Sequence, residues 1–144
     1  MVHISPCKIN DYKALIQIEK SIFKESISRN GFKSYENHAS HVIWKIEKIK
    51  IIGFVYFFHI KDEIEIIKIC VIKSHQRKNY GSILINEIKK LKIKKIFLEV
   101  SVENTNAIKF YFKNGFEKIG VRKGYYTKNK SSRIDALRLC VKLW

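Results

Sequence analysis

Short apolar runs, separated by charged residues, fill the middle of the chain. Residues 41–48 (HVIWKIEK), 51–60 (IIGFVYFFHI) and 63–73 (EIEIIKICVIK) are rich in β-branched and aromatic residues, which predicts three consecutive strands in an antiparallel meander. In a further run, 94–102 (KKIFLEVSV), successive side chains are expected on alternate faces of a predicted strand. One face of this predicted strand holds Ile96, Leu98, Val100 and Val102. The opposite face holds Phe97, Glu99 and Ser101.

Other segments have helical spacing. Asn10 or Asp11 can cap a helix with apolar positions Leu15, Ile16, Ile18 and Phe23. Residues 81–92 carry an apolar stripe opposed by lysines: Ile83, Leu84, Ile88 and Leu91. Residues 103–115 predict a helix that ends at a glycine, and 35–40 predict a shorter one after the polar stretch 24–34.

The ends of the chain complete a mixed domain with a largely antiparallel sheet. A short strand is predicted at 3–5, and two longer ones at 116–126 and 134–144. There is no repeat, no linker-like segment and a single proline, so residues 1–144 are expected to form one domain. A chain of this length buries roughly 70% of its unfolded surface without metal or disulfide.

Composition narrows the function classes. With 46% apolar residues, but no run long enough to cross a bilayer and no signal-peptide pattern, we expect a soluble cytoplasmic protein. Cys7, Cys70 and Cys140 form no CxxC pair, so we expect reduced core cysteines and no bound metal.

The formal net charge of +16 raises the question of a nucleic-acid partner. The positive residues are mostly lysines scattered through every segment, whereas arginine is favoured for bidentate phosphate recognition. We interpret the charge as a compositional bias toward Lys, Ile and Asn, and expect no dedicated DNA binding.

Three features carry candidate chemistry, and each also has an ordinary structural explanation. The loop HQRKNYGS, residues 75–82, precedes a helix whose free N–H groups can bind phosphate, but it can equally be a simple strand-to-helix connection. Glu99 is either a functional carboxylate or a lysine ion-pair partner. Tyr111 shares a helical face with Ala107 and Ile108 and is either functional or a core tyrosine, while Asn104 suits the helix cap.

In combination these features resemble a known family. The order of strand, QRKNYGS loop, helix, LEV strand, N-x-x-A-I-x-x-Y and N-G-F is similar to the acetyl-coenzyme A binding core of the GCN5-related N-acetyltransferases (GNAT) from about residue 52 to 139. With V-R-K-G-Y-Y and D-A-L, it most resembles the bacterial ribosomal-protein-alanine N-acetyltransferases. The resemblance implies an α/β (α+β) GNAT fold, with about seven mostly antiparallel strands flanked by about four helices.

The resemblance also implies a role for each matching residue. Glu99 would be the general base and Tyr111 the general acid. The residues expected to bind acetyl-coenzyme A are Ile69, Cys70, Val71, Gln76, Arg77, Lys78, Asn79, Tyr80, Gly81, Ser82 and Asn104. Tyr125 and Tyr126 would hold the acceptor, which in the family is the N-terminal alanine of a small-subunit ribosomal protein. The positive charge is compatible with transient ribosome association.

The chain departs from the family pattern at three places. Asn79 replaces the first glycine of the loop, although asparagine tolerates positive φ better than other non-glycine residues. Thr127 replaces the proline after the tyrosine pair, and the connection before the LEV strand is short. These departures bear on cofactor affinity and acceptor specificity rather than on the fold.

Transfer of an acetyl group from a thioester to an amine requires a base and benefits from an acid. An α-amino group has a pKa near 7.7 to 8.0, so most of it is protonated at neutral pH and a base must remove a proton. Backbone N–H groups near Val71 are placed to stabilise the oxyanion, and a phenol can protonate the departing thiolate. A Cys70 nucleophile would need a histidine base, and His75 is separated from it by the start of the loop. Two alternatives stay open: acetylation of lysine side chains, polyamines or another small amine, and a non-catalytic basic domain that binds RNA or the ribosome.

Overall fold

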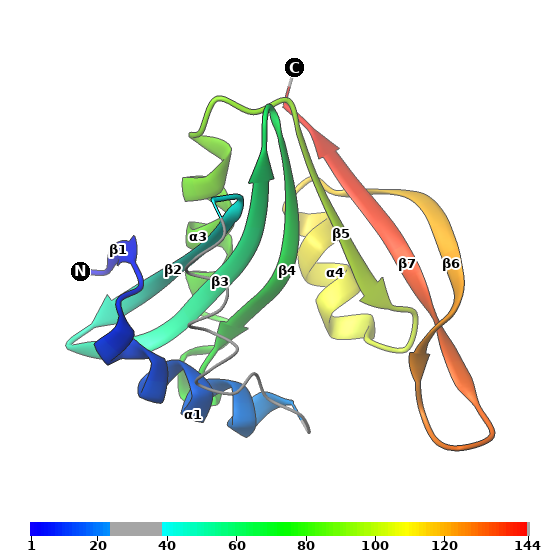
Figure 1. Cartoon of the computed structure of the whole chain (residues 1–144), viewed down its shortest axis with the longest axis horizontal. Helices are drawn as coiled ribbons and strands as arrows, with labels where there is room; N and C mark the ends of the chain where they lie inside the picture. Colours follow the sequence, from blue (N-terminus) through cyan, green and yellow to red (C-terminus); the bar gives the residue numbers. More distant parts are fainter. Residues whose placement is uncertain (24–38, 144) are drawn as a thin grey trace.

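The strands of the computed structural model form a single seven-stranded sheet (Figure 1). The structure describes residues 1–23 and 39–143. In chain order the strands are β1 (His3–Pro6), β2 (His41–Lys48), β3 (Lys50–Ile60), β4 (Glu63–Val71), β5 (Lys95–Ser101), β6 (Glu117–Thr127) and β7 (Arg133–Lys142). Their order across the sheet is β1-β2-β3-β4-β5-β7-β6, and β4 with β5 is the one parallel pair among them. The predicted α+β fold and the β2-β3-β4 meander are confirmed.

Helices cover both faces of this sheet. They are α1 (Tyr12–Ile22), α3 (Tyr80–Lys89) and α4 (Thr105–Lys113), with short 3₁₀ turns at Ile9–Asp11 and Lys73–His75. The described residues thus hold three α-helices where about four were expected. The helix predicted over 35–40 lies mostly outside the described residues, and its last two positions form a turn.

Strand β3 shows how the layers meet. Phe54 and Tyr56 pack with α1 on one face, while Val55 and Phe57 pack with α3 and α4 on the other. Each of these four residues is at most 2% exposed. The alternation of the strand therefore builds two apolar cores on opposite sides of one sheet.

Four local expectations need correction. Phe23 lies just beyond the end of α1 and is partly exposed, because the chain turns extended there. Asp11 is the N-cap residue of α1, as predicted, but its side chain makes no cap hydrogen bond to the helix, because its carboxylate accepts the N–H of Lys8. Val102 falls after the end of β5 and is 40% exposed, and Cys7 is only half-buried.

Strands β4 and β5 pair over only part of their length. Glu63–Ile66 align with Lys95–Leu98, and no further β4–β5 pair follows among the described residues. The β3–β4 register shifts at this point, because Tyr56 lies opposite Lys68 and Phe57 opposite Ile66, which leaves Ile67 as an extra residue. Such a bulge bends a strand and ends its pairing. We call this separation, from Ile67 on β4 and Glu99 on β5 onward, the fork; Figure 1 shows the two strands diverging.

Candidate active site

The β4 side of the fork contains the first group of predicted cofactor residues. Ile69, Cys70 and Val71 follow the bulge and pair with β3 on one edge of the strand. Cys70 is buried, and the Nε2 group of Gln76 donates to the Val71 carbonyl at 2.9 Å. Burial raises the pKa of the Cys70 thiol to about 12, with a further increase from Glu19 and an opposing effect of Lys68. The thiol is therefore protonated at neutral pH, which disfavours a cysteine nucleophile.

The loop between β4 and α3 has the backbone that an anion site requires. Arg77 and Asn79 have positive φ values of 61° and 70°, so asparagine does adopt the conformation expected of it. Helix α3 starts at Tyr80, and the Asn79 carbonyl accepts the N–H of Ile83 at 2.9 Å. The N–H groups of Tyr80, Gly81 and Ser82 belong to the first helical turn, where no intrahelical acceptor exists. These groups fit the pyrophosphate of a coenzyme.

Gly81 has a packing reason that the sequence pattern did not reveal. A Cβ atom at this position would lie 2.8 Å from Cζ of Phe110, which belongs to α4. The backbone conformation of Gly81 does not require glycine, since its φ is not positive. The glycine allows α3 and α4 to approach closely beside the loop.

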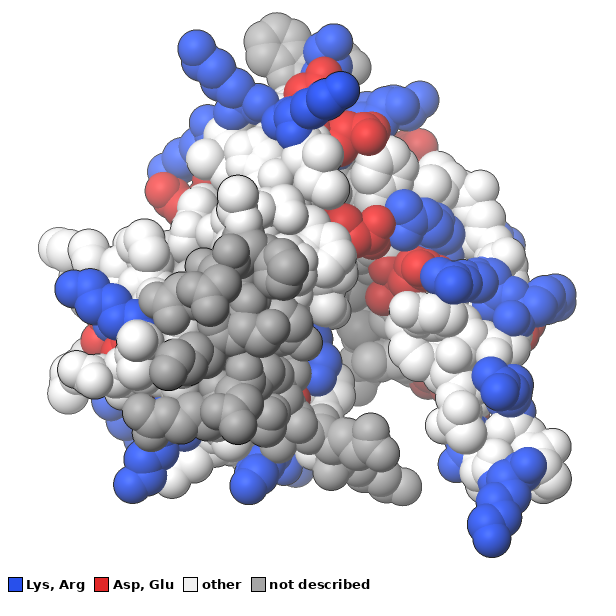
Figure 2. Space-filling view, in the orientation of Figure 1, with Lys and Arg blue, Asp and Glu red and all other residues white. Residues whose placement is uncertain are grey.

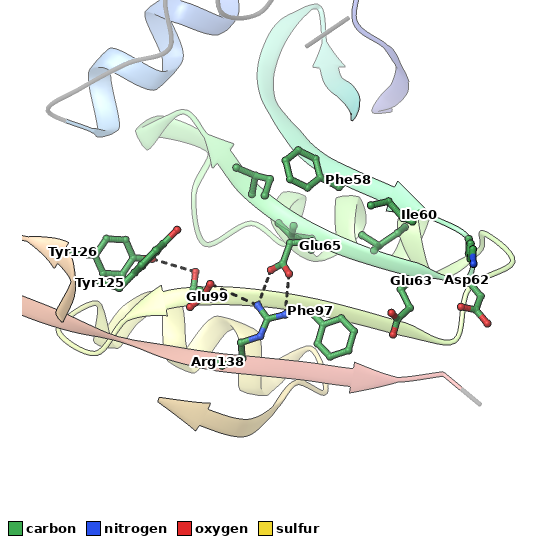
Figure 3. Close-up of a pocket in the computed structure, with 14 residues that line it drawn as sticks. Phe58, Ile60, Asp62, Glu63, Glu65, Phe97, Glu99, Tyr125, Tyr126 and Arg138 are labelled. Atoms are coloured by element: carbon green, nitrogen blue, oxygen red, sulfur yellow. Dashed lines mark hydrogen bonds and ion pairs between the residues drawn. The ribbon is translucent and has the colours of Figure 1, made fainter. Parts of the chain in front are cut away.

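Glu99 is on the sheet face opposite α3 and α4 (Figure 3). Its Oε1 atom lies 3.2 Å from Nη1 of Arg122 and 3.8 Å from Nη1 of Arg138, and its side chain is 16% exposed. Its Oε2 atom is buried and has no hydrogen-bond partner among the described residues. The predicted ion pair exists, but with arginines rather than a lysine, and it uses one oxygen only.

Arg138 also binds a second carboxylate. Its two terminal nitrogens donate to both oxygens of Glu65 on β4, at 2.9 and 3.0 Å. The guanidinium lies 5.1 Å from the ring centroid of Phe97, and Figure 3 shows it between Glu65 and Glu99. Sequence reasoning missed Arg138, Glu65 and Arg122. Opposite charges at alternating positions of the predicted strands were the available signal, but the strand order was needed to pair them.

Tyr111 lies on the helix-covered side of the sheet. Its side chain is 8% exposed, and its ring lies 5.6 Å from that of Phe116. Burial is the main cause that raises its pKa above the usual value for tyrosine, with smaller contributions from Cys70 and Tyr126. The phenol is thus neutral at physiological pH. Asn104 caps its helix, because Oδ1 accepts the N–H of Ala107 at 3.2 Å.

The tyrosine pair of β6 borders Glu99. The Tyr126 hydroxyl donates to the Glu99 carbonyl at 3.4 Å, and burial, followed by Tyr125 and Glu99, raises its pKa to about 12. Tyr125 is 44% exposed, with the guanidinium of Arg122 4.2 Å from its ring centroid. The two tyrosines therefore differ: one hydroxyl points into the site, and the other ring faces outward.

A groove gives access to these residues from the open face. It has a volume of about 750 Å³ and is lined by residues of β3 to β7, including Glu65, Glu99, Tyr125, Tyr126 and Arg138. Lysines and arginines are distributed over the face shown in Figure 2 without forming a single patch. The structure thus combines a carboxylate at a groove, a buried neutral phenol and a helix N-terminus around one fork.

Residues 12–116 match the model of the "Acetyltransferase (GNAT) family". The chain belongs to this family. It is an acetyltransferase, and the enzymes of the GNAT family use acetyl-coenzyme A. None of the helices in residues 1–23 and 39–143 has the length and apolar content needed to cross a membrane.

Several relatives of this acetyltransferase are similar over nearly their whole length. The [Ribosomal protein bS18]-alanine N-acetyltransferases of Haemophilus influenzae and Haemophilus ducreyi are each 27% identical, over 93% and 92% of this chain and 94% of each relative. The crystal structure of the ribosomal-protein-S18-alanine N-acetyltransferase from Escherichia coli matches with a TM-score of 0.86 and 26% identity, covering 99% of this chain and 94% of that one. A Vibrio cholerae/human chimera of spermidine N-acetyltransferase, at 22% identity and a TM-score of 0.85, covers 99% and 95% and shares the fold.

Proposed function

We propose that this acetyltransferase transfers the acetyl group of acetyl-coenzyme A to the N-terminal alanine of a small-subunit ribosomal protein. The observation that carries the proposal is the near full-length similarity to relatives named for that reaction. The geometry supports it, since Glu99 faces an open groove while the neutral Tyr111 lies in the core on the other side of the sheet. An acceptor amine can therefore approach one face while the thioester is held at the fork.

Acetyl-coenzyme A supplies an activated thioester, and three parts of the chain are suited to hold it. The backbone of Ile69 to Val71, whose second edge has no β5 partner among the described residues, pairs with the pantetheine arm. Residues 76–82 bind the pyrophosphate, because Arg77 and Asn79 have positive φ values and the N–H groups of the first turn of α3 have no intrahelical acceptor. Asn104, at the start of α4, contacts the region near the thioester.

Glu99 acts as the base. Two guanidinium groups lie at Oε1, and the Oε2 atom, which has no hydrogen-bond partner among the described residues, is left to accept a proton from the amine, directly or through a water molecule. Tyr125 and Tyr126 border this position and hold the acceptor peptide.

Tyr111 acts as the acid. A tyrosine phenol, whose ordinary pKa is near 10, is protonated at neutral pH and can deliver its proton to the thiolate as the thioester breaks. The backbone N–H groups of β4 near Val71 stabilise the oxyanion that precedes this step. A metal ion has no role in this scheme.

The test uses labelled acetyl-coenzyme A and three acceptors. These are a peptide beginning Ala-Arg, the same peptide with a blocked N-terminus, and spermidine. We expect label on the free peptide and at least 10-fold less on the other two. Equal labelling of both peptides would indicate lysine side-chain acetylation, and preferred labelling of spermidine a small-amine enzyme; either result would refute the proposal.

Transient association with the ribosome is a separate part of the proposal. Scattered lysines provide long-range attraction to RNA, and this term weakens as salt is added. Co-sedimentation with small ribosomal subunits should therefore fall as the salt concentration rises. Association that does not change with salt would contradict this part alone.

A further inference from the structure

We infer that the Glu65–Arg138 pair positions Glu99, by holding the Arg138 guanidinium on one carboxylate oxygen and away from the other. The inference rests on the proposed role of Glu99 as base. Arg138 and Glu65 are positioning residues here, because they act on the amine through Glu99 rather than directly.

The sheet places this pair beside the start of the fork. Arg138 on β7 lies opposite Glu99 on β5, and Glu65 on β4 lies opposite Phe97 on β5. The Arg138 side chain therefore crosses β5 over the Phe97 ring to reach Glu65. One side chain links three strands where β4 and β5 are about to separate.

The Arg138 guanidinium lies closer to Glu65 than to Glu99. Arg138 makes a bidentate pair with Glu65 at 2.9 and 3.0 Å, but its Nη1 atom is 3.8 Å from Oε1 of Glu99. A bidentate arginine–carboxylate pair has a fixed geometry and is stronger than a single contact. The guanidinium is thus hydrogen-bonded to Glu65, whereas it is close to Glu99 without a hydrogen bond.

This arrangement keeps Oε2 of Glu99 available. That atom is buried and has no hydrogen-bond partner among the described residues. Without Glu65, the same guanidinium could turn to Glu99 and bind both of its oxygens, since Arg138 and Glu99 are direct neighbours across the β5–β7 ladder. A carboxylate bound at both oxygens by a guanidinium has fewer free lone pairs and is a weaker base toward the amine.

Arg122 provides a comparison on the same oxygen. It lies closer to Oε1, at 3.2 Å, but its side chain is 60% exposed, against 31% for Arg138. Exposed pairs are screened and contribute little. We therefore expect Arg122→Gln to lower turnover by less than about 3-fold.

The experiment measures kcat for Glu65→Gln and Arg138→Gln in two backgrounds, the unaltered enzyme and Glu99→Gln. In the unaltered background we expect about a 10-fold loss for Glu65→Gln and a smaller loss for Arg138→Gln, with KM for acetyl-coenzyme A unchanged. Adding Arg138→Gln to Glu65→Gln should recover activity, because the guanidinium that captures Glu99 is gone. In the Glu99→Gln background each change should alter kcat by less than about 2-fold.

Two results would overturn the inference, and they are distinguishable. If Glu99→Gln lowers turnover but the Glu65 and Arg138 changes cause equal losses in both backgrounds, the pair acts on the fold and only the positioning role fails. If Glu99→Gln leaves turnover unaltered, the base assignment fails together with this inference. Glu87→Gln, which breaks the exposed Lys90 pair on α3, is the matched control and should leave kcat unchanged. Thermal unfolding of each variant checks that it folds.

Discussion

The two faces of the sheet beside the fork place an ionisable side chain in different environments. On the helix-covered face, Tyr111 is enclosed by apolar side chains of α3, α4 and the sheet, and burial keeps it neutral. On the open face, Glu99 lies at a groove, and its Oε1 atom is close to the guanidinium groups of Arg122 and Arg138. A buried phenol on one face and a carboxylate at a groove on the other face match the acid and the base of the proposed reaction.

This difference predicts that substitutions on the two faces affect different steps of the reaction. Changes on the helix-covered face should affect proton donation, coenzyme binding and stability, while changes on the open face should affect the acceptor. The following variants test that prediction in order of decreasing expected effect.

Tyr111→Phe is expected to have the largest effect. It removes the hydroxyl but keeps the buried ring, so kcat should fall by about 100-fold, or about 2.7 kcal/mol of transition-state stabilisation, with little change in the Kd of acetyl-coenzyme A. Steady-state kinetics and calorimetry give the two values.

The neighbouring Phe112, 48% exposed on the same helix, supplies the control for that change. Phe112→Tyr adds a hydroxyl outside the core and should leave kcat unaltered. If the Tyr111→Phe enzyme turns over at the normal rate, Tyr111 is not the acid, and the claim that the helix-covered face supplies the proton is wrong.

Gly81→Ala should destabilise the helix-covered face. The added Cβ meets the Phe110 ring at 2.8 Å, and overpacking of this kind costs about 1–3 kcal/mol. We expect a lower melting temperature and a higher KM for acetyl-coenzyme A, because the N–H groups at the start of α3 are the ones proposed to bind the pyrophosphate. Combining it with Phe110→Ala, compared with Phe110→Ala alone, should remove most of the additional loss; an undiminished loss would show that the Phe110 contact is not the cause.

Substitutions of Asn79, just before α3, should have a smaller effect on stability than Gly81→Ala. With a φ of 70°, Asn79→Ala should cost about 1 kcal/mol because alanine is disfavoured in that region, whereas Asn79→Gly keeps the backbone accessible. Urea unfolding should rank glycine above alanine, and acetyl-coenzyme A affinity should follow the same order. The reverse ranking would mean that the asparagine side chain, rather than its φ, matters.

The smallest effect concerns Tyr126 at alkaline pH. Its pKa in the folded protein is about 12, above the value near 10 of an unfolded chain. The folded state then binds the proton more tightly, so this contribution to stability is complete below pH 10 and is lost as the pH rises toward 12. Tyr126→Phe should therefore show a smaller fall in melting temperature between pH 9.5 and 11.5, and an identical fall would contradict the assignment.

The sequence predicted the elements well and the contacts between strands poorly. Alternation in 94–102 and helical spacing in 103–115 identified β5 and α4, because one buried face imposes a period on the residues. The fork itself was not predicted from periodicity. It depends on the bulge at Ile67, which shows only once the register of β3 against β4 is known.

The same limit applies to the site. Glu99 and Tyr111 were singled out because their residue types stand out on their elements and match a family pattern. Arg138 and Glu65 were missed because an ordinary charge on a strand becomes informative only when the strand order β4-β5-β7 places it beside another charge. Gly81 was assigned to the loop, whereas its close neighbour is Phe110, 29 positions later in the chain.

The most direct test of the proposed function is made on the acceptor in the cell. Mass spectra of the intact small-subunit ribosomal proteins would be compared between cells with and without this enzyme. We predict that one protein with an N-terminal alanine is acetylated only when the enzyme is present, and that cells carrying Glu99→Gln show a strong reduction of that modification. Identical acetylation of every small-subunit protein in all three strains would contradict the account.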